Sequence, residues 1–221
     1  MITLALDAST YEGDVAVVDG AQVLADGHTA MKRADRETLM PLVSETLQRA
    51  GIAPRAIDRV ICGAGPGSFT SLRIAASIAK GLTLGLRKPL FAVPSLALVV
   101  SGARLPSGRY VAALDALRGE VYVALYDVDP AGDVLEIERA RLIAASELER
   151  LAADSEARIV TPLQIDGAIR ARPMASGVVH LAAWIRDHGA VDATAWEPSY
   201  GRLAEAQVRW ESTHGKPLPA G

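Results

Sequence analysis

A short sequence pattern occurs twice in this chain of 221 residues, once near its beginning and once near its middle. Leu6-Asp7-Ala8 reappears as Leu114-Asp115-Ala116, and Gly13-Asp14-Val15 reappears as Gly119-Glu120-Val121. Around both copies, the order of apolar runs, turns and mixed segments predicts strand, strand, strand, helix and strand. Chance supplies two echoes in the same register less readily than one. We therefore predict an α/β chain that arose by internal duplication.

The first half carries strong local signals for its turns and helix ends. Asp19-Gly20 predicts a hairpin turn, and Gly51 is expected to end a helix as its C-cap. Pro41 is tolerated only in a first helical turn, so Thr38 is favoured as the helix start, with Asp35 as the alternative. The predicted strands cover residues 2–6, 13–18, 21–28, 60–62 and 89–93, and the predicted helices cover residues 38–50, 72–84 and 95–100.

A linker-like segment separates the two halves. Residues 101–108 are rich in glycine, proline and serine, which is typical of a domain boundary. We expect an N-terminal subdomain over residues 1–104 and a reduced C-terminal subdomain over residues 105–221. Its predicted strands cover residues 110–114, 120–126, 134–137 and 158–160, its predicted helices cover residues 146–152, 178–188 and 203–210, and residues 215–221 are expected to be a loose tail.

The composition excludes several classes of protein. Half of the residues are apolar and the formal net charge is −3, so no overall basic field attracts nucleic acid. Cys62 is the single cysteine, which excludes an internal disulfide and predicts a buried structural thiol. No stretch resembles a secretory signal or approaches the length of a membrane span. We therefore expect a cytoplasmic protein without membrane contact.

A glycine-rich turn follows the apolar run Val60–Cys62. Gly63, Gly65 and Gly67, with Pro66 between the last two, favour a tight backbone turn. The hydroxyl residues after them favour the start of a helix. A strand, such a turn and a helix N-terminus can bind phosphate together. The spacing matches neither a P-loop nor a dinucleotide-binding motif, so it indicates phosphate binding only weakly.

The helix predicted over residues 72–84 is apolar around most of its circumference. Its polar residues Arg73, Ser77 and Lys80 form one narrow stripe. A helix on its own sheet needs an apolar face of only about 100° or somewhat more. Two interpretations remain open: either a second layer of the same chain covers the excess apolar surface, or another protein covers it.

Asp7 and Asp115 end the first strand of each half, and we expect both to face one cleft. Two such carboxylates can hold magnesium through water, and the small residues Ser9 and Thr10 would let phosphate approach. Both aspartates can equally serve as turn-capping or helix-capping groups. The second half has no late glycine cluster, and it has Ala116-Leu117-Arg118 where a phosphate loop favours small residues. We therefore interpret the site as a vestigial nucleotide cleft.

Other reactive groups are too dispersed to form a recognisable site. No two histidines have the spacing that presents a pair to one metal ion from a helix; they are His28, His180, His188 and His214. Ser68 follows Gly-Pro-Gly and does not lie in a Gly-x-Ser-x-Gly elbow. We expect no catalytic residue and no metal ligand in this chain.

The glycine turn and the helix after it closely resemble the signature of the TsaB family, also called YeaZ. The run that carries this resemblance is Gly65-Pro66-Gly67-Ser68-Phe69-Thr70-Ser71-Leu72-Arg73-Ile74, followed by Ala79-Lys80-Gly81-Leu82. Supporting matches are Asp7-Ala8-Ser9-Thr10, Pro94-Ser95-Leu96, Asp115-Ala116-Leu117-Arg118-Gly119-Glu120-Val121-Tyr122 and Pro198-x-Tyr200. The chain departs from the family at Asp35-Arg36-Glu37 and at Ser71, where glycine is usual.

The resemblance implies a fold and a role. The fold would be the duplicated actin-like ATPase (ribonuclease H-like) fold, with two βββαβα-type subdomains and mixed sheets. The role would be a non-catalytic assembly and activation subunit for threonylcarbamoyladenosine modification of tRNA. It would bind the catalytic subunit TsaD and the ATPase TsaE, meet tRNA only through that complex, and form a homodimer when alone. No cofactor is implied, and ATP or ADP is expected only at an interface shared within the complex.

The same resemblance implies that the first two helices meet the partner. The residues expected at the partner or dimer interface are Leu39, Leu42, Val43 and Leu47 on the first helix, and Leu72, Ala75, Ala76 and Ala79 on the second. Two alternative functions remain. The second interpretation is a small ATP-dependent kinase or ATPase of the same fold that uses Asp7 and Asp115. A metallopeptidase is a distant third interpretation, because the paralogue TsaD carries a His-x-x-x-His metal pair where residues 94–100 of this chain have no histidine.

Overall fold

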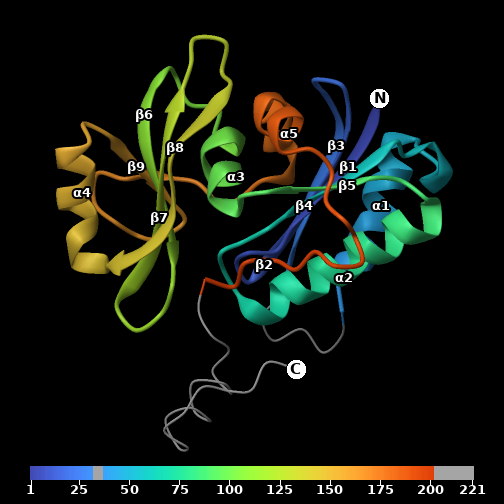
Figure 1. Ribbon diagram of the computed structural model, residues 1–221, viewed down its shortest axis with the longest axis horizontal. Helices are drawn as coiled ribbons and strands as arrows, with labels where there is room; N and C mark the ends of the chain where they lie inside the picture. Colours follow the sequence, from blue (N-terminus) through green and yellow to red (C-terminus); the bar gives the residue numbers. More distant parts are fainter. Residues whose placement is uncertain (32–36, 202–221) are drawn as a thin grey trace, which may run out of the picture.

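The computed structural model describes residues 1–31 and 37–201, and it contains two five-stranded mixed sheets, one from each half (Figure 1). The first has the order β3-β2-β1-β4-β5, and the second has the order β10-β9-β6-β7-β8. In both, the first three strands are antiparallel neighbours and the last two pair in parallel. The second order, taken from β8, repeats the first, which confirms the predicted internal duplication.

The strands begin and end close to their predicted positions. In the first sheet they are β1 (Ile2–Asp7), β2 (Glu12–Asp19), β3 (Gln22–Ala30), β4 (Arg59–Gly63) and β5 (Leu90–Val93). In the second they are β6 (Gly108–Asp115), β7 (Glu120–Val128), β8 (Val134–Ala144), β9 (Arg158–Thr161) and β10 (Ile169–Arg170). The sequence patterns missed the two-residue β10, and they ended β8 at residue 137. The later part of β8 is rich in charge, which an edge strand tolerates because its backbone pairs with β7 alone.

The described residues form five α-helices beside the sheets: α1 (Leu39–Ala50), α2 (Phe69–Leu86), α3 (Ser95–Gly102), α4 (Leu148–Asp154) and α5 (Ala182–His188). Short 3-10 helices cover Pro54–Ala56, Ala145–Glu147 and Ala175–His180. Gly51 ends α1 with φ 69°, as predicted for a C-cap. Thr38 is the N-cap residue but makes no capping hydrogen bond; the Glu37 carboxylate accepts the backbone N–H groups of Leu39 and Met40 instead. Asp35 lies outside the described residues.

The single helix predicted over residues 178–188 is wrong, because the chain forms a 3-10 helix and then α5 with a break at Leu181. The 3-10 helix packs tightly against the end of α3. A Cβ atom at Gly177 would lie 2.3 Å from the Ser101 Oγ atom and 2.7 Å from the Gly102 nitrogen. This close approach fixes the segment before Leu181, and Leu181 itself is buried in the core. The predicted helix over residues 203–210 and the tail over residues 215–221 lie outside the described residues.

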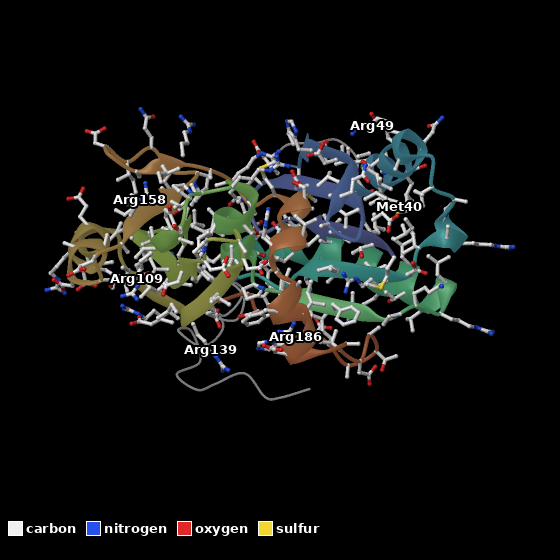
Figure 2. All side chains as sticks on the ribbon, turned by 90° about the horizontal axis from the view of Figure 1, so that it is seen from above. Met40, Arg49, Arg109, Arg139, Arg158 and Arg186 are labelled. Carbon is white, nitrogen blue, oxygen red and sulfur yellow. The ribbon has the colours of Figure 1, made fainter. Side chains whose placement is uncertain are left out.

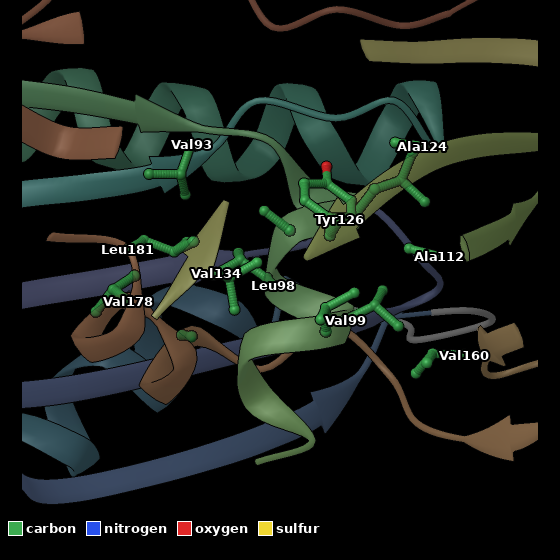
Figure 3. Close-up of a cluster of buried hydrophobic side chains, with 14 of the residues drawn as sticks. Val93, Leu98, Val99, Ala112, Ala124, Tyr126, Val134, Val160, Val178 and Leu181 are labelled. Carbon is green, nitrogen blue, oxygen red and sulfur yellow. The ribbon is translucent and has the colours of Figure 1, made fainter. Parts of the chain in front are cut away.

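The two halves share one hydrophobic core, with α3 at its centre (Figure 3). Alternate residues of the first sheet face this core, for example Ala5, while Leu4 and Leu6 face α1 and α2 on the other side. The second sheet divides in the same way, and its outer face packs against α4. Figure 1 shows the resulting layers: α1 and α2, the first sheet, α3 with α5, the second sheet, and α4.

The chain after β10 returns to the first sheet, although it follows the second sheet in sequence. The Val191 backbone N–H donates to the Leu90 carbonyl at 2.8 Å, and the Ser199 N–H donates to the Ala64 carbonyl at 2.8 Å. Residues 189–201, called the C-terminal strap below, then run beside α2 (Figure 1). The boundary expected between residues 104 and 105 thus separates the sheets, but the last described part of the chain packs on the first half.

No helix within residues 1–31 and 37–201 is both long enough and apolar enough to cross a bilayer.

Candidate functional site

A cleft of about 1190 Å³ opens between the two halves. Four parts of the chain line most of it: the β1–β2 turn, the start of α2, the β6–β7 turn, and the segment around β10. Ser9, Thr10 and Asp115 are among the lining residues, so the structure brings these three predicted residues together. Asp7 is not among them, because it lies beneath the β1–β2 turn with 1% of its surface exposed.

The Asp7 carboxylate is fully engaged by the chain itself. Its Oδ1 atom accepts the Ser9 backbone N–H at 2.9 Å and the Ser9 hydroxyl at 2.8 Å, and its Oδ2 atom accepts the Ser95 hydroxyl at 2.5 Å. Burial raises the pKa of Asp7 above its usual value, against the lowering effect of these hydrogen bonds. A Cβ atom at Gly63 would lie 1.9 Å from Oδ2, so only glycine fits beside the carboxylate. Neither oxygen is presented to the cleft.

The glycine turn brings three backbone segments together. A Cβ atom at Gly67 would lie 2.0 Å from the Ser9 carbonyl oxygen, and one at Gly65 would lie 2.2 Å from the Ser199 carbonyl oxygen. The Ser68 N–H donates to the Ser9 carbonyl at 2.7 Å, and the Gly65–Pro66 peptide bond is cis. The Cα positions of Gly65 and Gly67 therefore pack against the chain's own backbone. Phosphate binding at the start of α2, where Gly67 to Thr70 line the cleft, stays a prediction.

Asp7 and Asp115 perform the same local task in their two halves. Asp7 accepts the N–H of Ser9, and the exposed Asp115 accepts the N–H of Leu117 at 2.8 Å, in each case two residues further along. Both are therefore turn-capping aspartates. The second turn also holds Leu117 and Arg118 in the left-handed region, at φ 61° and 56°, and Leu117 is 52% exposed. Of the two interpretations of these aspartates, the geometry supports turn capping.

An ion pair between Asp14 and Arg172, a residue that lines the cleft, joins the segment after β10 to the first sheet. Asp14 on β2 is 3% exposed; it pairs with Arg172, and it accepts the Ala175 N–H at 2.7 Å. Arg172 also approaches Glu12 at 3.9 Å. Burial raises the pKa of Asp14 to about 6 in spite of the arginine. The sequence patterns missed this pair. An acidic residue inside an apolar strand was a signal for Asp14, but nothing pointed to a partner so distant in sequence.

The helix residues predicted at the partner interface need correction. All eight are buried within the chain itself; they are Leu39, Leu42, Val43, Leu47, Leu72, Ala75, Ala76 and Ala79. Most of them hold α1 and α2 against the outer face of the first sheet. The sequence pattern did not decide which face of each helix would contact the sheet. In the structure the apolar face contacts it, because this arrangement removes apolar area from water. That the two helices meet a partner stays a prediction, now for their outer faces.

The C-terminal strap covers part of the apolar excess on α2. Trp196 packs on the core beneath α1 and α2, Tyr200 contacts Phe69 with ring centroids 4.6 Å apart, and Lys80 pairs with Glu197 at 3.0 Å. A second layer of the same chain, one of the two open interpretations, is therefore confirmed for this side of the helix.

The outer face of α2 remains uncovered by the described residues. Ser77, Gly81 and Gly85 lie on it at four-residue spacing and are exposed. A hollow of about 460 Å³ lies beside them between the start of α1 and α2, lined by Glu37, Phe69, Thr70, Arg73, Ile74, Ser77 and Ile78. Met40 on α1 is 41% exposed, and Leu84 on α2 is 56% exposed. Figure 2 shows Met40 at this end of the molecule.

Two further expectations concern reactive groups. Cys62 is buried, and burial raises the pKa of its thiol above the usual range, so it packs as a structural thiol. Among the described residues, no three histidine, cysteine or acidic side chains are grouped to hold a metal ion.

Known proteins resemble this chain along nearly its whole length. The model of the family "TsaD: tRNA N6-adenosine threonylcarbamoyltransferase" matches residues 28–169. The tRNA threonylcarbamoyladenosine biosynthesis protein TsaB of Bacillus subtilis is 29% identical over 95% of this chain and 98% of that protein. The protein of the same name from Escherichia coli is 37% identical over 60% of this chain and 58% of its own length.

Solved structures agree with these relatives. A crystal structure of YeaZ from Pseudomonas aeruginosa has a TM-score of 0.73 and 26% sequence identity, and it covers 90% of this chain and 99% of that one. A second structure from the same organism, described as similar to peptidase YEAZ, has the same TM-score and 27% identity, over 91% of this chain. Together with the repeated sheet order, they establish the duplicated actin-like fold. The chain therefore belongs to the TsaB (YeaZ) family, within the wider family that the TsaD model describes.

Proposed function

We propose that this chain is a non-catalytic subunit of the system that makes threonylcarbamoyladenosine in tRNA. It binds a TsaD-like transferase and acts with a TsaE-like ATPase in the cytoplasm. The observation that carries the non-catalytic role is the state of the nucleotide-binding elements. Both oxygens of Asp7 accept hydrogen bonds from serines of the same chain, and the glycines of the turn pack against the backbone of Ser9 and Ser199.

The outer face of α2 supports the proposed partner contact. Gly81 and Gly85 lie inside this helix, where glycine costs about 1 kcal/mol relative to alanine. Among the described residues, a Cβ atom at either position would meet nothing within 4 Å, so packing against the described part of the chain does not require these glycines. A partner helix that approaches closely does require them. The adjacent hollow beside Arg73 and Ile78 would receive larger side chains of that partner.

The same two helices serve for a homodimer when the partner is absent, because exposed apolar side chains favour association. Met40 on α1 and Leu84 on α2 are large apolar side chains that are exposed. We further propose that any ATP or ADP bound by the complex is held at a shared interface, and that no cofactor is bound by this chain alone.

A substitution of Gly81 tests the contact. Gly81→Leu fills the open space on α2 with a side chain that favours helix, so the chain should fold at least as well while binding of the transferase falls. Ala153→Leu on the exposed side of α4 is the matched control. Co-purification with the transferase should be abolished for the first variant and retained for the second. Equal co-purification of the two would contradict the proposed surface.

The rival function, an ATPase that uses Asp7 and Asp115, makes the opposite prediction for the isolated chain. Calorimetry with magnesium–ATP should show no binding that depends on either aspartate. Binding abolished by Asp7→Ala, together with turnover by the isolated chain, would replace the proposed function with the rival.

A further inference from the structure

The described part of the chain ends at the cleft between the two halves. Gly201, its last residue, fits between them: a Cβ atom there would collide with the Tyr122 ring on β7 and would lie 2.9 Å from the Pro66 Cβ atom before α2. The Tyr122 hydroxyl donates to the Tyr200 carbonyl at 3.2 Å, and Tyr200 lines the cleft. Figure 1 shows the strap ending between the halves. Residues 202–221 therefore continue the chain from the opening of this cleft.

The charges that line the cleft cancel one another. Arg172 pairs with Asp14 on the first sheet. The other charged lining residues among those described are two arginines and two carboxylates: Arg118, Arg170, Glu12 and Asp115. A lining without surplus charge gives an ionic ligand no general advantage over an apolar one.

Apolar side chains line the same cleft from both halves. Those that are only half-buried or are exposed comprise Phe69 from the first half and Leu117, Leu163, Ile169 and Met174 from the second. They leave apolar area in contact with water, and an apolar occupant would remove that area from water. The cleft therefore favours an apolar occupant that contacts both halves together.

Leu117 is the most unusual of these lining residues. It is 52% exposed, and its backbone lies in the left-handed region at φ 61°, followed by Arg118 at φ 56°. Asparagine and glycine adopt this turn conformation readily, whereas a bulky side chain rarely does. The chain thus places an exposed leucine at the edge of the cleft in a strained turn. Strained backbone of this kind is concentrated where a protein holds a ligand or a moving segment.

The sequence directly after Gly201 has the pattern of an amphipathic helix over residues 203–210. With 3.6 residues per turn, Leu203 and Trp210 fall on one side of this helix, and Glu205 and Arg209 fall on the opposite side. Eight helical residues are about 12 Å long and about 10–12 Å wide with their side chains, so they fill a volume on the order of 1,000 Å³. The cleft, at about 1190 Å³, has a comparable size.

We propose that residues 202–221 dock in this cleft within their own chain, with Trp210 against Leu117 and the neighbouring apolar lining. The covalent tether favours this occupant over any other, because a segment joined by a short linker has an effective concentration on the order of millimolar. Docking removes Leu117 and Trp210 from water and connects the two halves, since the apolar lining comes from both. The inference goes beyond the proposed function and does not depend on it.

Fluorine NMR on the full-length chain, labelled with 5-fluorotryptophan, tests the docking. The chain has three tryptophans, Trp184, Trp196 and Trp210, and Trp210→Phe assigns the signal of the third. A soluble gadolinium chelate broadens the signals of indoles that it can approach, so the broadening measures exposure. The signal of Trp210 should be broadened no more than that of Trp196, which is half-buried in the strap.

A substitution at the edge of the cleft should expose Trp210. Leu117→Asn removes the apolar side chain and suits the left-handed backbone, so the turn keeps its shape. The broadening of the Trp210 signal should then rise toward that of free 5-fluorotryptophan. Leu135→Asn is the matched control, since Leu135 is 43% exposed on β8 and is not among the described residues that line the cleft. The control should leave the Trp210 signal unchanged.

A double-mutant cycle on unfolding gives a readout that needs no label. Leu117→Asn and Trp210→Gln together should change the unfolding equilibrium constant by roughly fivefold less than the product of the two single changes, because both remove the same contact. Leu135→Asn and Trp210→Gln should act independently, so their changes multiply. Circular dichroism checks that each variant is folded.

Three results would overturn the inference. A Trp210 signal in the unmutated chain that is broadened as strongly as free 5-fluorotryptophan would show that the segment does not dock. Protection of Trp210 that Leu117→Asn leaves intact would place the segment outside the cleft. Protection that falls when the protein is diluted about tenfold would assign the occupant to a second copy of the chain, because docking within one chain does not depend on concentration.

Discussion

At the scale of single residues, the cleft is shaped by two buried carboxylates and by glycines that admit other backbone segments. Asp7 and Asp14 lie in neighbouring strands and are 1% and 3% exposed. Each accepts a backbone N–H, from Ser9 and Ala175 respectively. The carboxylates thereby fix the turn after β1 and the segment after β10, which form parts of the cleft.

The raised pKa of Asp14 makes stability depend on pH. Its pKa is about 6 in the folded chain and about 3.9 in an unfolded one, so the folded state binds the proton more tightly. Between these values the unfolded state holds fewer protons, and the contribution of Asp14 to stability falls as pH rises from about 4 to about 6, by roughly 3 kcal/mol. Urea unfolding of the wild type and of Asp14→Asn measures this. The unfolding free energy of the wild type minus that of the variant should fall as pH rises from about 4 to about 6, and it should stay constant above pH 6. A difference that does not change with pH would contradict this.

Gly67 and Gly85 should respond in opposite ways to the same substitution. A Cβ atom at Gly67 would meet the Ser9 carbonyl oxygen at 2.0 Å, and backbone cannot move aside cheaply. Gly67→Ala should therefore cost roughly 2 kcal/mol or more of unfolding free energy, or prevent folding.

Gly85→Ala is the control for that substitution, since the new methyl group meets nothing within 4 Å. It should be neutral or stabilising by up to about 1 kcal/mol. Thermal unfolding of both variants decides the matter, and equal stability of the two would show that the glycine turn is not packed as described.

At the scale of elements, α2 has three neighbours and one open face within residues 1–31 and 37–201. The sheet lies beneath it, α1 beside it and the C-terminal strap along another side, while Ser77, Gly81 and Gly85 face outward. Apolar periodicity predicted the helix, but it could not predict the strap, which reaches α2 through Trp196 and Glu197 from far along the chain. The same limit explains why the eight helix residues were assigned to a partner interface. The pattern predicted which side chains would be buried, but it did not show that the sheet of the same chain would bury them.

The strap should be held by buried apolar area more than by charge. Trp196→Ala removes a half-buried ring from the core beneath α1 and α2 and should cost roughly 2 kcal/mol. Glu197→Gln removes an ion pair to Lys80 whose acidic side chain is 63% exposed, and it should change stability by less than about 1 kcal/mol. Chemical denaturation measures both, and a larger effect of the second change would reverse this assignment.

At the scale of the whole molecule, the duplication was visible in the sequence because both copies keep the strand that ends in aspartate and the turn after it. The sheet order then followed, since each half repeats one pairing pattern. The cleft could be predicted in position but not in content. Arg118, Arg170 and Tyr11 converge only because the halves fold against one core, and no local pattern records that convergence.

The most direct measurement for the proposed role is the yield of threonylcarbamoyladenosine on tRNA in a purified reaction. The reaction contains the transferase and ATPase of the same organism and the substrates, with or without this chain. Product should form only when the chain is present, and Gly81→Leu should abolish its effect while Ala153→Leu should not. Full modification in the absence of the chain would contradict the account.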